Sequence, residues 1–180
     1  MAHGATIRVL APAEIDAVWS IDRTERIESI YRVRSGGLVL EPVLHDLRGW
    51  PTGEPERDGA LLRDCMEHGG SAFGAFDGGT LIGAAVLEGR FIGAAGDRLQ
   101  LKFLHVSHGH RGTGLGRALF EEARAKAHAL GARRLYVSAT PSENTIRFYL
   151  ARGCRLTEER DPDLFALEPE DIHLECDVPA

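Results

Sequence analysis

The chain of 180 residues lacks a long hydrophobic run. A membrane-spanning helix needs about 20 mostly apolar residues, and no stretch of the sequence approaches that length. The first ten residues also lack the basic start and long apolar segment of a secretion signal. We therefore expect a protein of the cytoplasm with no membrane partner.

Cysteine and positive charge are also scarce. The three cysteines, Cys65, Cys154 and Cys176, are odd in number and none has metal-ligand spacing, so we expect small buried side chains, no disulfide framework and no metal. The formal net charge of −6 argues against a nucleic-acid partner, because nucleic-acid-binding proteins usually carry a basic patch. An acidic balance suits a cationic substrate such as an amine, although solubility alone also explains it.

The remaining composition is that of an ordinary globular protein. Hydrophobic residues make up 43% of the chain and charged residues 27%, which is enough apolar material for one core. A chain of this length is too short to hold two cores comfortably. We therefore expect a single domain that spans residues 1–180.

Hydrophobic periodicity and turn residues divide the chain into strands and helices. Strands are expected at Ala5–Leu10, Leu38–Leu44, Ala72–Phe76, Leu81–Leu87, Leu99–Val106, Arg134–Ala139, Cys154–Glu159 and Ile172–Val178. Helices are expected at Glu14–Ile21, Thr24–Val33, Arg57–His68, Gly114–Leu130 and Ser142–Arg152, and loops at Leu47–Pro55, Gly89–Asp97 and Asp161–Pro169. This order predicts an α+β fold with one mixed, mostly antiparallel central sheet flanked by helices.

Three glycines, Gly112, Gly114 and Gly116, lie between the strand that ends at Val106 and the helix that follows. Backbone N–H groups at the start of a helix bind phosphate, and the helix dipole adds partial positive charge there. Glycine allows a close approach of the backbone to the phosphate. The turn is therefore a candidate phosphate site, with positive charge from Arg111 and Arg117.

Two familiar glycine turns do not match this one. A P-loop needs a lysine after its last glycine, and Arg117 follows Gly116 here. A dinucleotide-binding turn has the spacing G-x-G-x-x-G and an acid at the end of the next strand, whereas this turn reads G-x-G-x-G and the next strand ends in Val137–Thr140. The sequence therefore disfavours both nucleotide uses.

The run R-G-T-G-L-G at Arg111–Gly116 matches R-x-x-G-x-G, the acetyl-CoA signature of the GCN5-related N-acetyltransferase (GNAT) superfamily. The stretch Asn144–Cys154 resembles that family's second block, N-x-x-A-x-x-F-Y-x-x-x-G-F. It departs from the block at Arg147, where alanine is common, and at Cys154, where an aromatic residue is usual. The resemblance extends over about Ser71–Leu156 and implies a GNAT-type fold.

The resemblance also implies an activity, which is acetyl-CoA-dependent N-acetyl transfer by direct attack of an amine within a ternary complex. Acetyl-CoA would be a co-substrate, and Val106 N–H would polarise its thioester carbonyl. Tyr149 would be the general acid that protonates the departing thiolate, although an aromatic residue packed in the core is the alternative. The implied cofactor-binding residues are Leu104, His105, Val106, Arg111, Gly112, Thr113, Gly114, Leu115, Gly116 and Asn144.

The general base is harder to assign. Family members often carry an acid or a histidine on the strand that ends at Val106, but Gln100 and Lys102 occupy those positions. We take Glu88, at the end of the neighbouring strand, as the candidate base, and an ordinary exposed acid is the alternative. His105 shares the strand side of Leu99, Leu101 and Phe103, which favours a buried structural histidine.

The acceptor site is expected in residues 22–54, which exceed what the minimal fold needs between its first helices. Acids beside aromatic side chains suit a cationic amine. The candidates are Asp22, Glu25, Glu28, Tyr31, Glu41, Asp46 and Trp50, with the loop at Asp161–Pro169 and its Phe165 as a second wall. We expect a small-molecule amine acceptor. A protein or peptide acceptor, a non-catalytic acyl-CoA-binding module and a homodimer all stay open.

Overall fold

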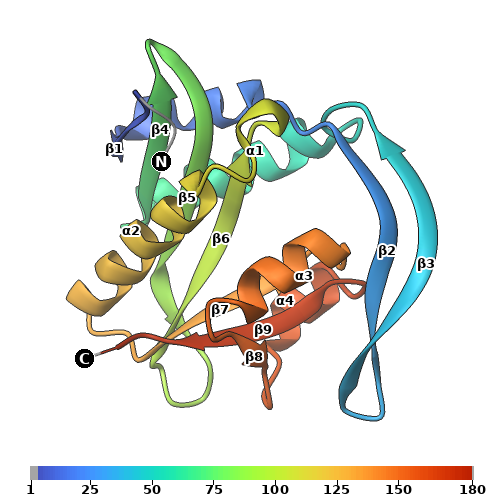
Figure 1. Ribbon diagram of the computed structural model, residues 1–180. Helices are drawn as coiled ribbons and strands as arrows, with labels where there is room; N and C mark the ends of the chain where they lie inside the picture. Colours follow the sequence, from blue (N-terminus) through green and yellow to red (C-terminus); the bar gives the residue numbers. More distant parts are fainter. Residues whose placement is uncertain (1–3, 180) are drawn as a thin grey trace.

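The computed structural model describes residues 4–179 and contains a seven-stranded sheet with helices on both faces (Figure 1). The strand order is β1-β4-β5-β6-β7-β9-β8, and β6 and β7 are the one parallel pair in this sheet of the described chain. The strands are β1 (Thr6–Leu10), β4 (Ser71–Asp77), β5 (Thr80–Ile92), β6 (Arg98–Val106), β7 (Arg134–Ala139), β8 (Arg155–Leu156) and β9 (Ile172–Asp177). The expected α+β fold with a mixed, mostly antiparallel sheet is confirmed.

The helices divide between the two faces of the sheet. Helix α2 (Leu115–Ala129) contacts β4, β5 and β6, and it buries Leu119, Phe120 and Ala123 against that face. Helix α1 (Glu54–Glu67) and the 3₁₀ helix η1 (Pro12–Ser20) contact β5 and build a second apolar cluster. Burial of each large apolar side chain contributes about 1.5–3 kcal/mol, so the two clusters hold α1 and α2 on the sheet. The remaining helices are η2 (His108–His110), α3 (Glu143–Leu150) and α4 (Pro162–Leu167). No helix within residues 4–179 is long and apolar enough to cross a membrane.

A two-stranded ribbon, β2 (Glu25–Arg34) and β3 (Gly37–Leu47), stands beside the main sheet (Figure 1). The helix expected at Thr24–Val33 was therefore wrong. The register shifts between Ile27 and Ser29, so the inward side chains Ile27 and Ile30 are three positions apart. A strand with such a bulge imitates the apolar spacing of a helix.

Three smaller expectations also need correction. The segment Pro162–Leu167 forms α4, capped by Asp161, inside what was expected to be a loop. The strand expected at Cys154–Glu159 is reduced to Arg155–Leu156, and the loop between β5 and β6 is shorter than expected because β5 continues to Ile92. Short segments such as these depend on their packing partners more than on local pattern.

Strand β6 contains a bulge of its own. Val86 pairs with Phe103 and Leu87 with Leu101, so Lys102 is an extra residue in β6. Leu99 and Leu101 pack in the cluster on the α2 side, whereas Phe103 packs in the cluster on the α1 side. His105 contacts Phe103 and so does not share the side of Leu99 and Leu101, which corrects the expected alternation.

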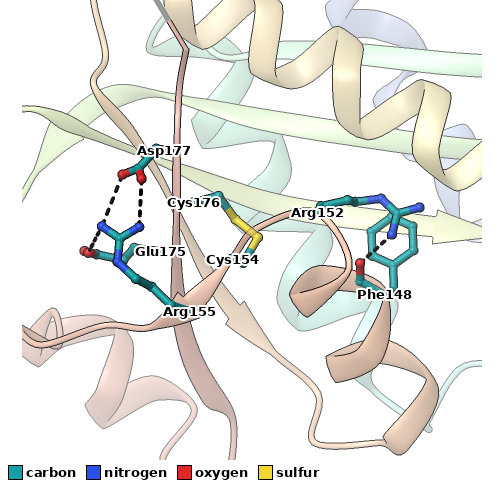
Figure 2. Close-up of a disulfide and its surroundings, with 7 residues drawn as sticks. All are labelled: Phe148, Arg152, Cys154, Arg155, Glu175, Cys176 and Asp177. Atoms are coloured by element: carbon teal, nitrogen blue, oxygen red, sulfur yellow. Dashed lines mark hydrogen bonds and ion pairs between the residues drawn. A yellow bond between two sulfur atoms is a disulfide. The ribbon is translucent and has the colours of Figure 1, made fainter.

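A disulfide joins Cys154 and Cys176, with 4.2 Å between their Cα atoms (Figure 2). This corrects the expectation of three unpaired cysteines, although Cys65 is free and buried as expected. Arg155 lies opposite Glu175 in the β8–β9 pair, so the neighbouring Cys154 faces Cys176. The disulfide therefore connects the segment that follows α3 to β9.

Candidate active site

The cavity that forms the candidate active site lies between β6 and β7. Among the residues described, the parallel pairing is short: Arg98–Gln100 of β6 pair with Arg134–Tyr136 of β7. Beyond these residues the two strands separate. A cavity of about 860 Å³ occupies this fork. Residues 100–106 of β6 and Ser138, Ala139 and Thr140 line its sides. The β6 edge that faces β7 is thus open for a ligand that pairs with a strand.

The glycine turn forms one end of the cavity. Gly112 and Gly114 have φ values of +76° and +89°, and a Cβ added at either would meet nothing within 4 Å. Gly114 is the N-cap of α2 and gives the helix no side-chain cap, so the N–H groups of its first turn are available to an anion. Gly116 has a different reason to be glycine, because a Cβ there would lie 3.3 Å from the Phe148 ring.

The two arginines expected to flank the turn have different positions. Arg111 turns inward, where its Nε donates to Val106 O at 3.0 Å and its Nη1 lies 3.6 Å from Glu25. Arg117 is exposed at the turn, and Arg152 lines the same end of the cavity over the Phe148 ring (Figure 2). The positive charge at this end therefore comes from Arg117 and Arg152. Arg152 was not predicted as a site residue, although it lies within the Asn144–Cys154 block.

The predicted cofactor-binding residues of the turn and of β6 are brought together. Leu104, His105 and Val106 line the cavity with Arg111, Gly112, Gly114 and Gly116. Thr113 and Leu115 do not line it. Thr113 Oγ1 donates to His110 O at 2.7 Å and stabilises the turn, and Leu115 is buried in the α2 cluster.

His105 is packed between aromatic rings. Its ring centroid lies 4.9 Å from that of Trp50 and 4.7 Å from that of Phe103. Burial, with the charges of Arg23 and Arg111, lowers the pKa of His105 to about 3. The imidazole is therefore neutral at physiological pH and is a poor proton acceptor.

Helix α3 places Asn144 and Tyr149 on the cavity wall. The helix begins where expected, because Ser142 Oγ accepts from Thr145 N at 3.3 Å. Tyr149 is 5% exposed. Burial raises the pKa of Tyr149 above its usual value, so the phenol is protonated at neutral pH.

Glu88, the candidate base, does not line the cavity. It is 5% exposed and accepts hydrogen bonds from Gly89 N at 3.0 Å and from Lys102 Nζ and Arg90 Nε at 3.4 Å. Burial acts to raise the pKa of Glu88, but these three donors together hold it below its usual value. The carboxylate is thus occupied in an ion-pair cluster beside the cavity.

Four carboxylates that sequence analysis missed line the end of the cavity away from the glycine turn. Glu54 and Asp58 come from the start of α1, and Glu168 and Asp171 come from the connection between α4 and β9. Burial and then the charge of Asp58 raise the pKa of Glu54. The four positions come together only through tertiary packing. The one local feature that could have indicated them is that Glu168 and Asp171 lie three residues apart just before the last strand. We call this group the carboxylate end.

Few of the acceptor residues expected in residues 22–54 reach the cavity. Arg23, Glu25 and Glu54 are the members of this segment that line it, and Arg23 and Glu25 form a buried ion pair of 2.7 Å. The other expected acids pair with arginines on the surface or cap a turn: Glu28 with Arg26, Glu41 with Arg34, Asp46 with Arg48, and Asp22 with Thr24 N. Tyr31 and Phe165 also lie off the cavity wall, which Leu164 and Leu167 join instead. Trp50 packs against Trp19.

The chain resembles known acetyltransferases in both sequence and structure. A model of the acetyltransferase (GNAT) family matches residues 40–154. Streptothricin acetyltransferase of Streptomyces lavendulae is 29% identical over 147 residues, which are 77% of this chain and 75% of that protein.

Two solved structures share the fold over nearly the whole chain. A nourseothricin acetyltransferase superposes with a TM-score of 0.72 at 22% identity and covers 98% of this chain and 99% of its own. A proposed streptothricin acetyltransferase of Bacillus anthracis, solved with acetyl coenzyme A, superposes with a TM-score of 0.66 at 15% identity and covers 99% and 100%.

Proposed function

Because the chain belongs to the acetyltransferase (GNAT) family, we propose that it transfers an acetyl group from acetyl-CoA to a primary amine of a small cationic molecule. One observation carries this proposal. A single cavity connects the glycine turn, which suits the phosphates of a CoA donor, to the carboxylate end, which suits a positively charged acceptor. Several carboxylates favour an acceptor with more than one positive charge.

The donor would lie along the fork. The turn at Gly112–Gly116 would bind the pyrophosphate through backbone N–H groups, with Arg117 and Arg152 as nearby cations. The open edge of β6 at Leu104–Val106 would pair with the pantetheine amides, and Asn144 would bind the arm from α3. The thioester would then lie deep in the fork, within reach of both strands.

The reaction would be a direct transfer between two bound substrates. The amine nitrogen attacks the thioester carbonyl carbon, the C–N bond forms, and the C–S bond breaks with its electron pair on sulfur. Tyr149 is protonated and next to the cavity, so its hydroxyl can donate a proton to the departing sulfur. Holding both substrates in one cavity lowers the entropic part of the barrier.

Streptothricin is the first acceptor to test, because the chain is similar to a streptothricin acetyltransferase. A thiol-release assay with acetyl-CoA would compare it with linear polyamines, aminoglycosides, single amino acids and lysine-containing peptides. We expect release with polycationic small molecules and little with monocationic amino acids.

Two other outcomes would replace the proposal. Thiol release with peptides alone would indicate a protein acetyltransferase. Binding of acetyl-CoA, measured by calorimetry, without release for any amine would indicate a non-catalytic acyl-CoA-binding module. Mass spectrometry of the product would show whether the added group is acetyl and on which nitrogen it lies.

A further inference from the structure

The proposed reaction needs a group that accepts a proton from the acceptor amine. Glu88 is held by Arg90 and Lys102 outside the cavity, and His105 is neutral with a strongly lowered pKa. Gln100 cannot ionise, and Lys102 has its ammonium group in the ion pair with Glu88. None of these four residues is therefore suited to accept the proton of the amine.

Asp171 has the placement that the role requires. It is the residue just before β9, and the β7–β9 pairing of Ala139 with Ile172 holds it beside the wall of the fork. Its Oδ2 accepts a hydrogen bond from Ser138 Oγ at 3.3 Å, which orients the carboxylate from the neighbouring strand. Asp171 is partly exposed toward the cavity, so an amine can reach it.

Asp171 belongs to the carboxylate end and shares the cavity wall with Tyr149 of α3. The charges of Glu168 and Glu54, two other members of the carboxylate end, act on it. Its own charge acts in turn on Tyr149. A carboxylate that lines the cavity with both the acceptor carboxylates and the acid that would protonate sulfur can contact the attacking nitrogen.

We propose that Asp171 is the catalytic base that takes a proton from the attacking amine, an inference that rests on the acetyl transfer proposed above. The acceptor ammonium gives one proton to Asp171, which passes it to solvent. The neutral nitrogen then forms the C–N bond, and the C–S bond breaks as sulfur takes the proton of Tyr149. The second nitrogen proton leaves through Asp171 and replaces, through solvent, the one that Tyr149 gave up.

The surroundings of Asp171 tune it for this work. Burial, followed by the charge of Glu168, raises the pKa of Asp171 to about 7, with a smaller contribution from Glu54 and against the hydrogen bond from Ser138. The other charged or titratable residues on the cavity wall are Arg23, Glu25, Asp58, Lys102, His105, Arg111, Arg117, Tyr149 and Arg152. A base is most effective when its pKa lies near the working pH.

The first test replaces the carboxylate with a group of the same shape that does not ionise. For the wild type, the plot of kcat/KM against pH should show a rising limb near pH 7, where Asp171 loses its proton. The limb that reports the ionisation of the amine itself lies at higher pH. Asp171→Asn should lower kcat by about 10²- to 10⁴-fold and abolish this limb. Its Kd for acetyl-CoA should not change, which also shows that the variant is folded.

The second test moves the limb without removing the base. Glu168→Gln removes a charge that raises the pKa of Asp171, so the limb should move by about half a pH unit to lower pH. Ser138→Ala removes a hydrogen bond that lowers this pKa, so the limb should move to higher pH. The matched control is Glu170→Gln, which removes the same charge from an exposed neighbour off the cavity wall and should leave the limb in place.

The outcomes separate a base from a binding residue. An Asp171→Asn variant that raises KM but retains the limb near pH 7 would overturn the proposal, because Asp171 would then only bind the ammonium group. Limbs that stay in place in both Glu168→Gln and Ser138→Ala would also overturn it, even if Asp171→Asn fails to fold. Failure of the acetyl transfer itself is distinct, since the wild type would then release no thiol with any amine.

Discussion

Tyr149 is a buried residue of α3 that also lines the cavity. Replacing it with phenylalanine removes one oxygen and keeps the ring that packs in the core, so the free energy of unfolding should fall by no more than about 1.5 kcal/mol. If the hydroxyl protonates sulfur, Tyr149→Phe should lower kcat by about 10²-fold or more and leave the Kd for acetyl-CoA unchanged. Steady-state kinetics and calorimetry measure the two quantities.

A matched control for this variant lies on the ribbon. Tyr31 is a β2 residue that does not line the cavity, so Tyr31→Phe makes the same chemical change away from the site. It should leave kcat as it is. Unchanged turnover in Tyr149→Phe would refute the acid role and leave Tyr149 as a packing residue of α3.

Asp171 should affect stability as well as turnover. Its pKa is about 7 in the folded protein against an ordinary 3.8, so the folded state binds this proton more tightly than the unfolded chain does. The carboxylate therefore destabilises the fold increasingly as pH rises from about 4 to about 7, and by a constant amount above that.

The asparagine variant removes this pH-dependent cost. Asp171→Asn should unfold at higher urea concentration than the wild type. The difference in the free energy of unfolding between variant and wild type should be larger at pH 8 than at pH 5, by a few kcal/mol at most. An advantage that is equal at the two pH values would contradict the raised pKa.

At the scale of elements, helix α2 offers a control within itself. Gly114 begins it and Gly131 follows its end, both have φ of +89°, and a Cβ at either would meet no atom within 4 Å. Alanine at either position should cost about 1–2 kcal/mol of stability through backbone strain. Only Gly114→Ala should raise the Kd for acetyl-CoA, because only Gly114 lines the cavity. Equal Kd values in the two variants would place the donor phosphates elsewhere.

The disulfide affects the connection from α3 to β9. It closes a loop with a sequence separation of 22 residues, for which loss of chain entropy predicts about 3 kcal/mol of stabilisation. A reductant should lower the free energy of unfolding of the wild type but not of the double variant Cys154→Ala/Cys176→Ala. Burial raises the pKa of Cys65 to about 12, so the folded, oxidised protein should show no fast-reacting thiol.

Local motifs explain what the sequence could predict at this scale. The glycine turn and the Asn144–Tyr149 face each lie within one short segment, so their residue types identify them without knowledge of the packing. The helix expected at Thr24–Val33 failed because a bulge after Ile27 breaks the alternation of a strand. The side of β6 on which His105 lies was misjudged for the same reason, since Lys102 is an extra residue there.

The rest of the site depends on contacts between distant segments. Asp171 and Glu54 share the carboxylate end only because the α4–β9 connection packs across the cavity from α1. The Cys154–Cys176 pair follows from the register of β8 against β9. The sequence of two such short strands does not predict that they pair in this register. Neither the base nor the acceptor wall was therefore within reach of pattern alone.

At the scale of the molecule, charge is divided along one cavity. Arg117 and Arg152 lie at the glycine turn, and Glu54, Asp58 and Glu168 lie at the carboxylate end. A CoA donor is anionic and the proposed acceptor is cationic, so each would be attracted to its own end. For a polycationic acceptor, kcat/KM should fall roughly three- to tenfold as salt rises from about 0.02 to about 0.3 M.

Two variants separate the contributions of the ends. Glu54→Gln/Asp58→Asn should weaken the salt dependence for the acceptor and leave that for acetyl-CoA unchanged. Arg117→Gln should do the reverse. If the acceptor's salt dependence is the same in both variants and the wild type, the carboxylate end does not receive the cation.

The ribbon of β2 and β3 is attached to the rest of the molecule at a position that matters for the cavity. Ile30 bridges to Ser142, and Tyr31 N donates to Pro141 O at 2.8 Å, just before the helix that carries Asn144 and Tyr149. The ribbon therefore braces α3 from outside. Among its acids, Glu25 lines the cavity, where it is held in the ion pair with Arg23.

The fork between β6 and β7 leaves a sheet whose two halves share only a short ladder at Arg98–Gln100. A donor paired with the free edge of β6 would supply further rungs and join the halves as one cooperative unit. Amide exchange in β6 beyond Gln100 would then slow on ligand binding, while the β4–β5 hairpin, which is fully paired already, would keep its protection. The open sheet would thus be completed by its substrate.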